Sequence, residues 1–319
     1  MPPSPHDRPP PRDQPRPEPS LNGQAAPERP PYARVTALAA ALLLTLAACS
    51  DGDDGARGTK PKDKRKEESS NGVRLPGAGA VFDYQLGGAY PPDSDVEVVS
   101  RDRAAKPARG AYNVCYVNAF QTQPGDAIDW WREHHPQLLL RDGSGEEKGE
   151  GKGDLVIDED WDEPLLDLST PAKRTALLRV VGPWIDGCAD DGFDAVEFDN
   201  LDSYERSDEL LTPEDAAAFA RLLTRRAHAD GLAAGQKNTA ALLPQRARIG
   251  FDFAVVEECA RYGECAPFAT AYHDRVFDIE YRAQDFTRGC ARWKDRLSVT
   301  LRDLDVLPAD EKGHVNRHC

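Results

Sequence analysis

Residues 191–200 have the sequence DGFDAVEFDN, and this stretch decides which fold the rest of the chain predicts. Successive side chains of a strand point to opposite faces. Ala195, Glu197 and Asp199 therefore share one face, and the apolar residues between them share the other. We expect the apolar face to pack under helices and the acidic face to line a barrel or a cleft. Unpaired carboxylates are costly to bury, which favours an active-site role for Asp199. A structural Asp that caps the following loop is the alternative.

The remainder of the folded region repeats this alternation of strands and helices. Pro171 favours a helix start and Gly231 a helix end. With about 245 residues after the N-terminal region, the pattern predicts a single (β/α)8 TIM barrel, although one large doubly wound domain has a similar length. Strands are expected at 81–86, 96–100, 112–118, 138–140, 232–235, 251–256, 276–279 and 297–301, and helices at 128–135, 172–189 and 212–229.

The N-terminal region has the composition of an export signal. Residues 1–34 are rich in Pro and are expected to be disordered. Residues 35–48 form an uncharged apolar run that is too short to span a membrane and is typical of a signal-peptide core. The tetrapeptide 46–49, LAAC, resembles a bacterial lipobox, in which Cys49 is lipidated. An ordinary secretion signal with a spare cysteine is the alternative.

These segments predict three parts of the chain. They are a signal peptide with lipobox over 1–49, a flexible linker over 50–72 and a barrel domain over 73–319. We expect an exported protein, held on the outer face of the cell membrane as a lipoprotein or secreted.

The barrel domain is strongly acidic. After residue 70 the chain holds 29 Lys and Arg against 45 Asp and Glu, a net charge of −16. Such a surface repels nucleic acid and anionic membranes and attracts a cationic substrate. We therefore expect no nucleic-acid partner, membrane contact only through the lipid anchor, and a monomer.

Six cysteines remain after Cys49, and an even number in an exported chain favours disulfides. The sequence alone leaves 15 pairings open. The short loop between Cys259 and Cys265 is the best candidate for a local bridge, and a bridge from Cys290 to Cys319 would hold the end of the chain. The other two candidates are Cys115 and Cys188. No metal site is expected, because the chain lacks CxxC and HExxH motifs, and no cofactor is expected.

Five predicted strands end in charged residues, namely Asp199, Lys237, Glu257, Glu280 and Asp303. The carboxyl ends of barrel strands meet at one mouth, where the active sites of such barrels lie. A carboxylate-rich mouth suits hydrolysis of a glycosidic bond, which requires one ionised carboxylate and one carboxylic acid. Asp199 is the candidate for the ionised group because Lys237 ends the next strand. Glu257 is the candidate acid because apolar residues precede it on its face.

Several sequence blocks resemble glycoside hydrolase family 114. They are DYQL at 83–86, GFDAVEFDN at 192–200, QKN at 236–238, FDFAV at 251–255, EEC at 257–259 and IEY at 279–281. The resemblance implies a TIM barrel with endo-α-1,4-polygalactosaminidase activity, and it assigns the two catalytic carboxylates to Asp199 and Glu257. The implied partner is a galactosamine-containing polysaccharide, which is cationic when deacetylated.

From these observations we expect hydrolysis with retention, which requires carboxyl groups about 5 Å apart, whereas about 6.5–9.5 Å means inversion. Two alternatives remain. One is a cell-surface lipoprotein whose barrel binds polysaccharide without cleaving it, and the other is an anchored lipoprotein with only a structural role. The residues expected to bind substrate are Asp83, Tyr84, Gln85, Asn118, Glu197, Asn200, Lys237, Asn238, Glu280, Tyr281 and Asp303.

Overall fold

The computed structural model describes residues 72–143 and 153–319. The predicted signal peptide, the lipobox Cys49 and nearly all of the predicted linker lie outside the described residues. Among the residues that are described, no helix is long and apolar enough to cross a membrane.

Eight parallel strands form the central sheet, in the spatial order β1, β2, β3, β6, β7, β8, β9 and β10. Parallel strands joined in sequence order place all their carboxyl ends at one edge, which becomes the mouth of the barrel. Their bounds are Phe82–Gln85 for β1, Val98–Asp102 for β2, Tyr112–Asn118 for β3, Ala195–Asp199 for β6, Ala233–Lys237 for β7, Phe253–Glu257 for β8, Val276–Glu280 for β9 and Ser298–Arg302 for β10.

The sheet curves into a nearly closed barrel. The Thr300 hydroxyl of β10 donates a hydrogen bond to the carbonyl of Phe82 in β1 over 3.0 Å, so the first and last parallel strands lie side by side. The short strand β11 (Asn316–His318) pairs antiparallel with β10. This confirms the predicted barrel class, with one antiparallel strand added that the sequence pattern did not indicate.

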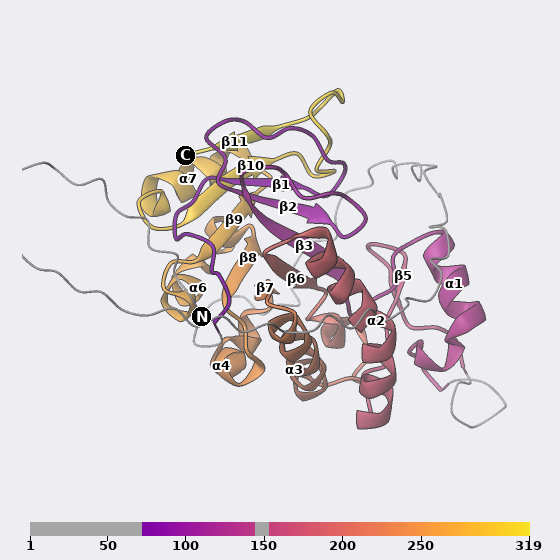
Figure 1. Cartoon of the computed structure of the whole chain (residues 1–319). Helices are drawn as coiled ribbons and strands as arrows, with labels where there is room; N and C mark the ends of the chain where they lie inside the picture. Colours follow the sequence, from indigo (N-terminus) through magenta and orange to yellow (C-terminus); the bar gives the residue numbers. More distant parts are fainter. Residues whose placement is uncertain (1–71, 144–152) are drawn as a thin grey trace, which may run out of the picture. The chain divides into compact units, whose positions relative to one another are not determined.

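Helices cover the outside of the strands (Figure 1). The predicted capping signals lie where the helices begin: the Thr170 side chain accepts from the Lys173 amide, and Thr212 and Asp215 form a capping box. The helices are α1 (Asp126–His134), α2 (Pro171–Asp191), α3 (Pro213–Ala229), α4 (Arg246–Ile249), α5 (Cys259–Tyr262), α6 (Cys265–Tyr272) and α7 (Ala283–Trp293), with short 3-10 turns η2 (Pro136–Leu138), η3 (Ser203–Arg206) and η4 (Ala240–Gln245).

The helical layer is incomplete around the first three strands. The described connections from β1 to β2 and from β2 to β3 contain no helix. Gly87, Gly88, Pro91 and Pro92 interrupt the first connection, and Pro107 interrupts the second, because these residues disfavour helix interiors. The ideal alternation of the (β/α)8 barrel therefore holds only from β3 onward.

An insertion follows β3 and leads to α2. It contains α1 and a hairpin of β4 (Ile157–Asp158) and β5 (Glu163–Pro164). The strand expected at 138–140 is not present as a regular element: residue 138 ends η2, and Leu139 forms only an isolated bridge with Leu166.

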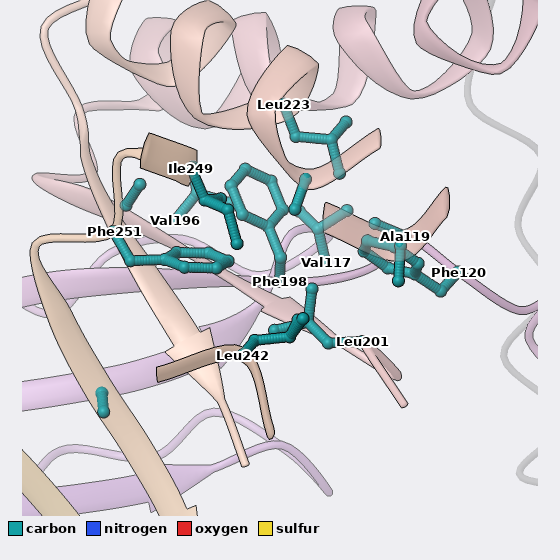
Figure 2. Close-up of a cluster of buried hydrophobic side chains, with 14 of the residues drawn as sticks. Val117, Ala119, Phe120, Val196, Phe198, Leu201, Leu223, Leu242, Ile249 and Phe251 are labelled. Atoms are coloured by element: carbon teal, nitrogen blue, oxygen red, sulfur yellow. The ribbon is translucent and has the colours of Figure 1, made fainter. Parts of the chain in front are cut away.

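Two apolar layers lie on the two sides of the sheet. Figure 2 shows the outer layer, where Val196 and Phe198 of β6 pack with Leu223 of α3. The inner layer fills the barrel and includes Ala195 and Phe253. This is the division of faces expected for residues 195–199.

Close packing inside the barrel requires glycine at one position. A Cβ on Gly235 of β7 would lie 2.7 Å from the ring of Phe253, which is too close for any side chain at that position. The aromatic ring occupies that space instead and fills the inner layer below the mouth.

Three disulfides connect the six expected cysteines. Cys115 in β3 bonds to Cys188 in α2. Cys259 bonds to Cys265, and Cys290 bonds to Cys319. The two bridges favoured by spacing are both confirmed, and the third ties the sheet to the helical layer.

Candidate active site

Lys237, at the end of β7, occupies the centre of the barrel mouth. Its Nζ lies 3.2 Å from Asp199 Oδ2 and 3.3 Å from Glu257 Oε2. It also lies 3.6 Å from Glu197 Oε1 and donates a hydrogen bond to the Tyr84 hydroxyl over 3.0 Å. Strand β7 lies between β6 and β8, so the residues that end these three strands necessarily meet. The sequence prediction that Lys237 would stand beside Asp199 is confirmed.

Lys237 is buried, but its charge is compensated. Burial alone would lower the pKa of Lys237, yet the carboxylates of Asp199, Glu257 and Glu197 outweigh burial and hold that pKa well above its usual range. The ammonium group therefore stays charged, and it contacts a carboxyl group on each side of the mouth.

Asp199 is held by three donors. Tyr116 donates from its hydroxyl to Oδ2 over 2.8 Å, and the Asn200 backbone amide donates to Oδ1 over 2.8 Å. Lys237 completes the set. All three donors are directed at the carboxyl oxygens, so Asp199 is held in a fixed orientation beside Lys237.

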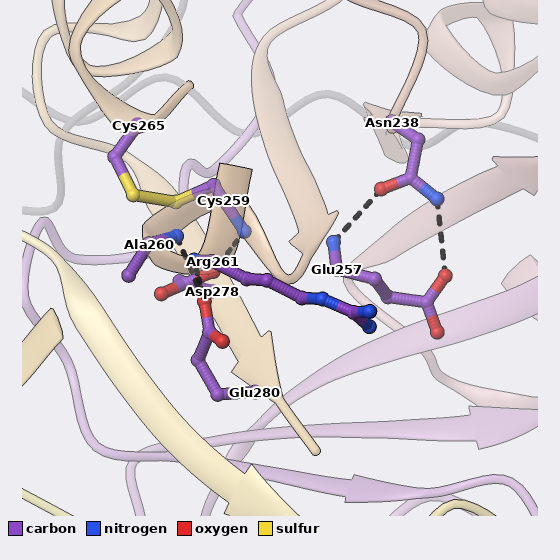
Figure 3. Close-up of a disulfide and its surroundings, with 8 residues drawn as sticks. All are labelled: Asn238, Glu257, Cys259, Ala260, Arg261, Cys265, Asp278 and Glu280. Atoms are coloured by element: carbon purple, nitrogen blue, oxygen red, sulfur yellow. Dashed lines mark hydrogen bonds between the residues drawn. A yellow bond between two sulfur atoms is a disulfide. The ribbon is translucent and has the colours of Figure 1, made fainter. Parts of the chain in front are cut away.

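Glu257 lies in a polar setting and not in the apolar one expected from its strand. The apolar residues that precede it on this face, Phe253 and Val255, point into the barrel below it. Asn238 Nδ2 donates to Glu257 Oε2 over 3.0 Å, and the Tyr281 hydroxyl donates to Oε1. Figure 3 shows that Asn238 also accepts from the Glu257 backbone amide, over 2.8 Å.

The two candidate carboxyl groups are close together. Because Lys237 Nζ lies 3.2 Å from Asp199 Oδ2 and 3.3 Å from Glu257 Oε2, these two oxygens are at most about 6.5 Å apart. Retaining glycosidases have carboxyl groups about 5–5.5 Å apart, which is below this upper limit. Inverting glycosidases have them about 6.5–9.5 Å apart, and only the lower end of that range reaches the limit.

Glu197 lies beneath this pair, inside the barrel. It is fully buried, and it accepts hydrogen bonds from Tyr84 over 3.1 Å and from Ser100 over 2.9 Å. Burial raises the pKa of Glu197 to about 7, although the ammonium of Lys237 acts in the opposite direction. Glu197 therefore supports Lys237 from below and lies out of reach of a sugar at the mouth.

Three tyrosines surround the carboxylates as hydrogen-bond donors. Burial is the main cause that raises the pKa of Tyr84, Tyr116 and Tyr281 well above its usual range. Their hydroxyl groups stay protonated and orient the carboxyl groups. Tyr84 and Tyr281 are both expected from the sequence to bind substrate, but their hydroxyls donate to Glu197 and Glu257 instead.

The chain turns sharply directly after the strands that carry these groups. Asn200, Asn238 and Glu258 each have a positive φ, of 62°, 46° and 58°. Asn tolerates this left-handed conformation better than most residues, whereas Glu rarely adopts it. These turns leave Asp199, Lys237 and Glu257 as the last residues of their strands, facing the open mouth.

The other predicted residues of the first and last strands lie in separate networks. Asp83 accepts from Gln85 Nε2 and from the Tyr90 hydroxyl, both over 2.7 Å. Glu280 accepts from the backbone amide of Ala260 over 2.8 Å. Asp303 accepts from backbone amides of the C-terminal segment. Within the described part of the chain, none of these contacts involves Lys237 or the acids that contact it.

One acid at the mouth, Glu163, is not among the residues predicted from the sequence. Glu163 of β5 accepts from Asn118 Nδ2 over 3.0 Å, and Asn200 Nδ2 lies 3.5 Å from the same oxygen. Burial raises the pKa of Glu163 to about 8. Its signal in the sequence was the stretch DEDWDE at 158–163, an acidic run around one Trp.

One group of potential metal ligands comes close together among the described residues, namely Cys259, Cys265 and Asp278. The two sulfur atoms form a disulfide, so neither is available as a thiolate.

A barrel of parallel strands whose mouth holds two close carboxylates around a buried cation has the architecture of the glycoside hydrolases. The model of glycoside-hydrolase family GH114 matches residues 62–319, and the chain belongs to this family. It is therefore a glycoside hydrolase, as the sequence blocks predict. No match was found among curated proteins.

Two solved structures are similar to this chain. The crystal structure of Aspergillus fumigatus Ega3 in complex with galactosamine superimposes with a TM-score of 0.60 at 22% identity, over 77% of this chain and 97% of that one. A variant of the glycoside hydrolase domain of PelA from Pseudomonas aeruginosa gives a TM-score of 0.49 at 16% identity, over 75% of this chain and 98% of that one. At such identities the likeness to Ega3 shows the barrel fold.

Proposed function

We propose that this protein cleaves α-1,4-linked, galactosamine-containing polysaccharide, using Asp199 and Glu257 and retaining the configuration of the anomeric carbon. The observation that carries the proposal is the pair of carboxylates that share Lys237 at the mouth. Membership of family GH114 and similarity to a structure solved with galactosamine support the substrate class. The acidic surface of the domain suits a polymer that is cationic where it is deacetylated.

Asp199 acts as the nucleophile in this mechanism. Its three donors hold its carboxyl group in place, and its oxygen attacks the anomeric carbon as the glycosidic bond breaks. Glu257 donates a proton to the departing oxygen, so a covalent glycosyl–enzyme forms and the shortened polymer leaves. Glu257 then removes a proton from water, which attacks the anomeric carbon and releases Asp199. The side chain of Glu257 is 30% exposed against 17% for Asp199, so it is the better placed of the two to reach the leaving oxygen.

Asp199→Asn and Glu257→Gln test the proposal. Each change keeps the shape of the side chain and removes the carboxylate that the reaction requires. We expect each to lower kcat on deacetylated oligogalactosamine by at least about 100-fold in a reducing-end assay, with binding of the oligomer retained. The control is Glu205→Gln, which removes an exposed carboxylate from the neighbouring turn η3.

Normal cleavage by both variants would refute the assignment of the two residues. Binding of the oligomer by the wild type without any cleavage would indicate the alternative, a barrel that only binds polysaccharide. The products of the wild-type reaction, analysed by proton NMR before mutarotation, distinguish retention from inversion.

We further propose that the protein is exported and anchored through Cys49. Three disulfides support an oxidising compartment, and the apolar run followed by LAAC at 46–49 supports lipidation. We expect Cys49→Ser to abolish incorporation of a labelled fatty acid and to release the protein from the membrane fraction. Retention of both label and membrane association in that variant would contradict the anchor.

A further inference from the structure

The hairpin β4–β5 is not part of the barrel, yet it is anchored on the mouth from both of its strands. From β4, Asp158 accepts from Gln121 Nε2 over 2.8 Å and pairs with Arg206 Nε over 2.7 Å. From β5, Glu163 accepts from Asn118 at the end of β3. The hairpin therefore stands over the carboxyl ends of β3 and β6.

Glu163 differs from the other acids at the mouth because its hydrogen-bond donors are amides and not a cation. Asn118 and Asn200 both direct their Nδ2 atoms at Glu163 Oε2. The nearest guanidinium, that of Arg206, forms its ion pairs with Asp158 and Asp202 at 2.7 and 2.9 Å. Asp199 and Glu257, by contrast, both contact the ammonium of Lys237.

The surroundings of Glu163 disfavour its ionised form, and a cation beside it would compensate for this. Burial is the first cause of the raised pKa of Glu163, the hydrogen bond from Asn118 lowers it, and the negative charges of Asp199 and Asp158 raise it again. Arg206 lowers it only in part. A cation next to this carboxyl would favour its ionised form and gain a strong interaction in a setting with little water.

Glu163 is also close to the proposed nucleophile. Asn200 directly follows Asp199, and its side chain lies 3.5 Å from Glu163 and 3.0 Å from Asn118 Oδ1. Asn200 therefore links Glu163 to Asp199, and Glu163 borders the place where a sugar would meet Asp199. On a deacetylated galactosamine unit one substituent is an ammonium group.

The tip of the hairpin carries an exposed aromatic ring. Trp161 is 66% exposed, more than any other large hydrophobic residue in the described ranges. It is flanked by the exposed acids Glu159, Asp160 and Asp162. Trp161 and Glu163 are two positions apart in the chain. Their Cα atoms are therefore at most about 7.6 Å apart, since consecutive Cα atoms are 3.8 Å apart. One face of a sugar ring presents C–H groups, which pack against an aromatic ring, and the acids attract a cationic chain.

We propose that the hairpin β4–β5 recognises a protonated galactosamine unit of the substrate, with Glu163 accepting hydrogen bonds from its ammonium group and Trp161 stacking on the adjoining sugar. This inference rests on the proposed function and adds a preference for deacetylated polymer. An N-acetyl group has no charge and is larger, so Glu163 distinguishes the two forms and Trp161 does not.

Binding measurements test the two halves of the proposal. The Glu257→Gln enzyme, which binds without cleaving, is titrated with a deacetylated galactosamine oligomer and with the same oligomer after chemical N-acetylation. Adding Glu163→Gln is expected to weaken binding of the deacetylated oligomer by about tenfold or more, as loss of a hydrogen bond to a charged group does, and binding of the acetylated one by less than about threefold. Adding Trp161→Ala is expected to weaken both by similar factors of about five to ten.

Glu133→Gln, on helix α1 and outside the hairpin, is the control: it removes one exposed negative charge and should leave both affinities within about twofold of the parent. Unfolding temperatures of all variants identify a fold defect, and Glu163→Asp, which keeps the charge, should recover part of the affinity for the deacetylated oligomer.

Unchanged affinity of Glu163→Gln for the deacetylated oligomer, or an equal loss for both oligomers, would overturn the role of Glu163. Unchanged affinity of Trp161→Ala would overturn the stacking. These affinity results test the hairpin proposal alone if the wild type cleaves the oligomer. Failure of the wild type to cleave either form is a separate result, and it refutes the proposed function instead.

Discussion

Two groups of acids lie at neighbouring strand ends and have different partners. Asp199 and Glu257, from β6 and β8, share the ammonium of Lys237 and stay partly open to the mouth. Asp278 and Glu280, from β9, face the first backbone amides of α5: Asp278 accepts from Cys259 N over 3.1 Å. Figure 3 shows both acids beneath the Cys259–Cys265 disulfide, on the side away from Glu257.

The difference follows from which face of each strand is inside. In β6 the acidic residues share the inner face with Ala195, whereas in β9 the inner face is formed by Phe277 and Ile279. Asp278 and Glu280 therefore point outward toward the helices. Burial raises the pKa of Asp278 well above its usual range, and the neighbouring Glu280 raises it further. Acids of the first group face the mouth and share a cation, whereas acids of the second group accept hydrogen bonds from the first backbone amides of α5.

Removing the shared cation is expected to affect both the stability and the activity of the protein. Lys237→Met leaves three carboxylates at the mouth without their counter-ion. We expect the free energy of unfolding to fall by about 3–5 kcal/mol, as it does when one partner of a buried ion pair is lost, and kcat to fall by at least about 100-fold. Urea unfolding and the reducing-end assay measure the two effects.

The matched control is Lys312→Met, because Lys312 is exposed in the C-terminal segment. If Lys237→Met were as stable and as active as this control, the cation would have no role in the first group.

Glu197, the buried acid beneath the first group, predicts a pH effect. Glu197 has a folded-state pKa of about 7, above its usual value of 4.5. The folded state therefore binds a proton more tightly than the unfolded state, and this contribution to stability is lost as the pH rises from about 4.5 to about 7. We expect the wild type to lose about 3 kcal/mol more than Glu197→Gln does across this range, given 1.36 kcal/mol for each pKa unit.

Urea unfolding of both proteins at pH 4.5, 6 and 7.5 measures the difference. The exposed residue Glu205, changed to Gln, controls for the loss of a charge. Parallel curves for the wild type and Glu197→Gln would show that Glu197 is already ionised at low pH.

The second group is expected to affect stability more than catalysis. Glu280→Gln keeps one oxygen for the amides of Ala260 and Arg261 but places an amide group where Asp278 lies. We expect a loss of about 1–3 kcal/mol in the free energy of unfolding, as for a buried polar group left with a poor partner, and a change in kcat below about tenfold.

Thermal and urea unfolding are compared with those of Glu264→Gln, an exposed acid between α5 and α6. A loss of activity as large as that of Glu257→Gln, with stability unchanged, would place Glu280 in the first group and remove the distinction.

Much of the architecture could be predicted because it depends on local signals. The division of faces in residues 195–199, the capping of α3 by Thr212 and Asp215, and the disulfide across the short 259–265 loop all follow from neighbouring residues. The meeting of Asp199, Lys237 and Glu257 also followed from order alone, since consecutive parallel strands lie side by side.

The structure was needed wherever a choice depended on residues far apart. A barrel is apolar on both sides of its sheet, so alternation in a strand such as β9 does not reveal which face is inside, and Glu280 was therefore grouped with the mouth acids. Glu163 reaches the mouth through an insertion, and its contact with Asn118 spans 45 positions of sequence. The pairing of Cys115 with Cys188 likewise required the packing of α2 on β3.

The sequence by itself therefore determined the eight parallel strands and the chemical nature of the groups at their ends, because these depend on period, caps and short loops. Only the tertiary structure decided which of those groups face each other, because the curvature of the sheet and the orientation of each strand set the direction of every side chain.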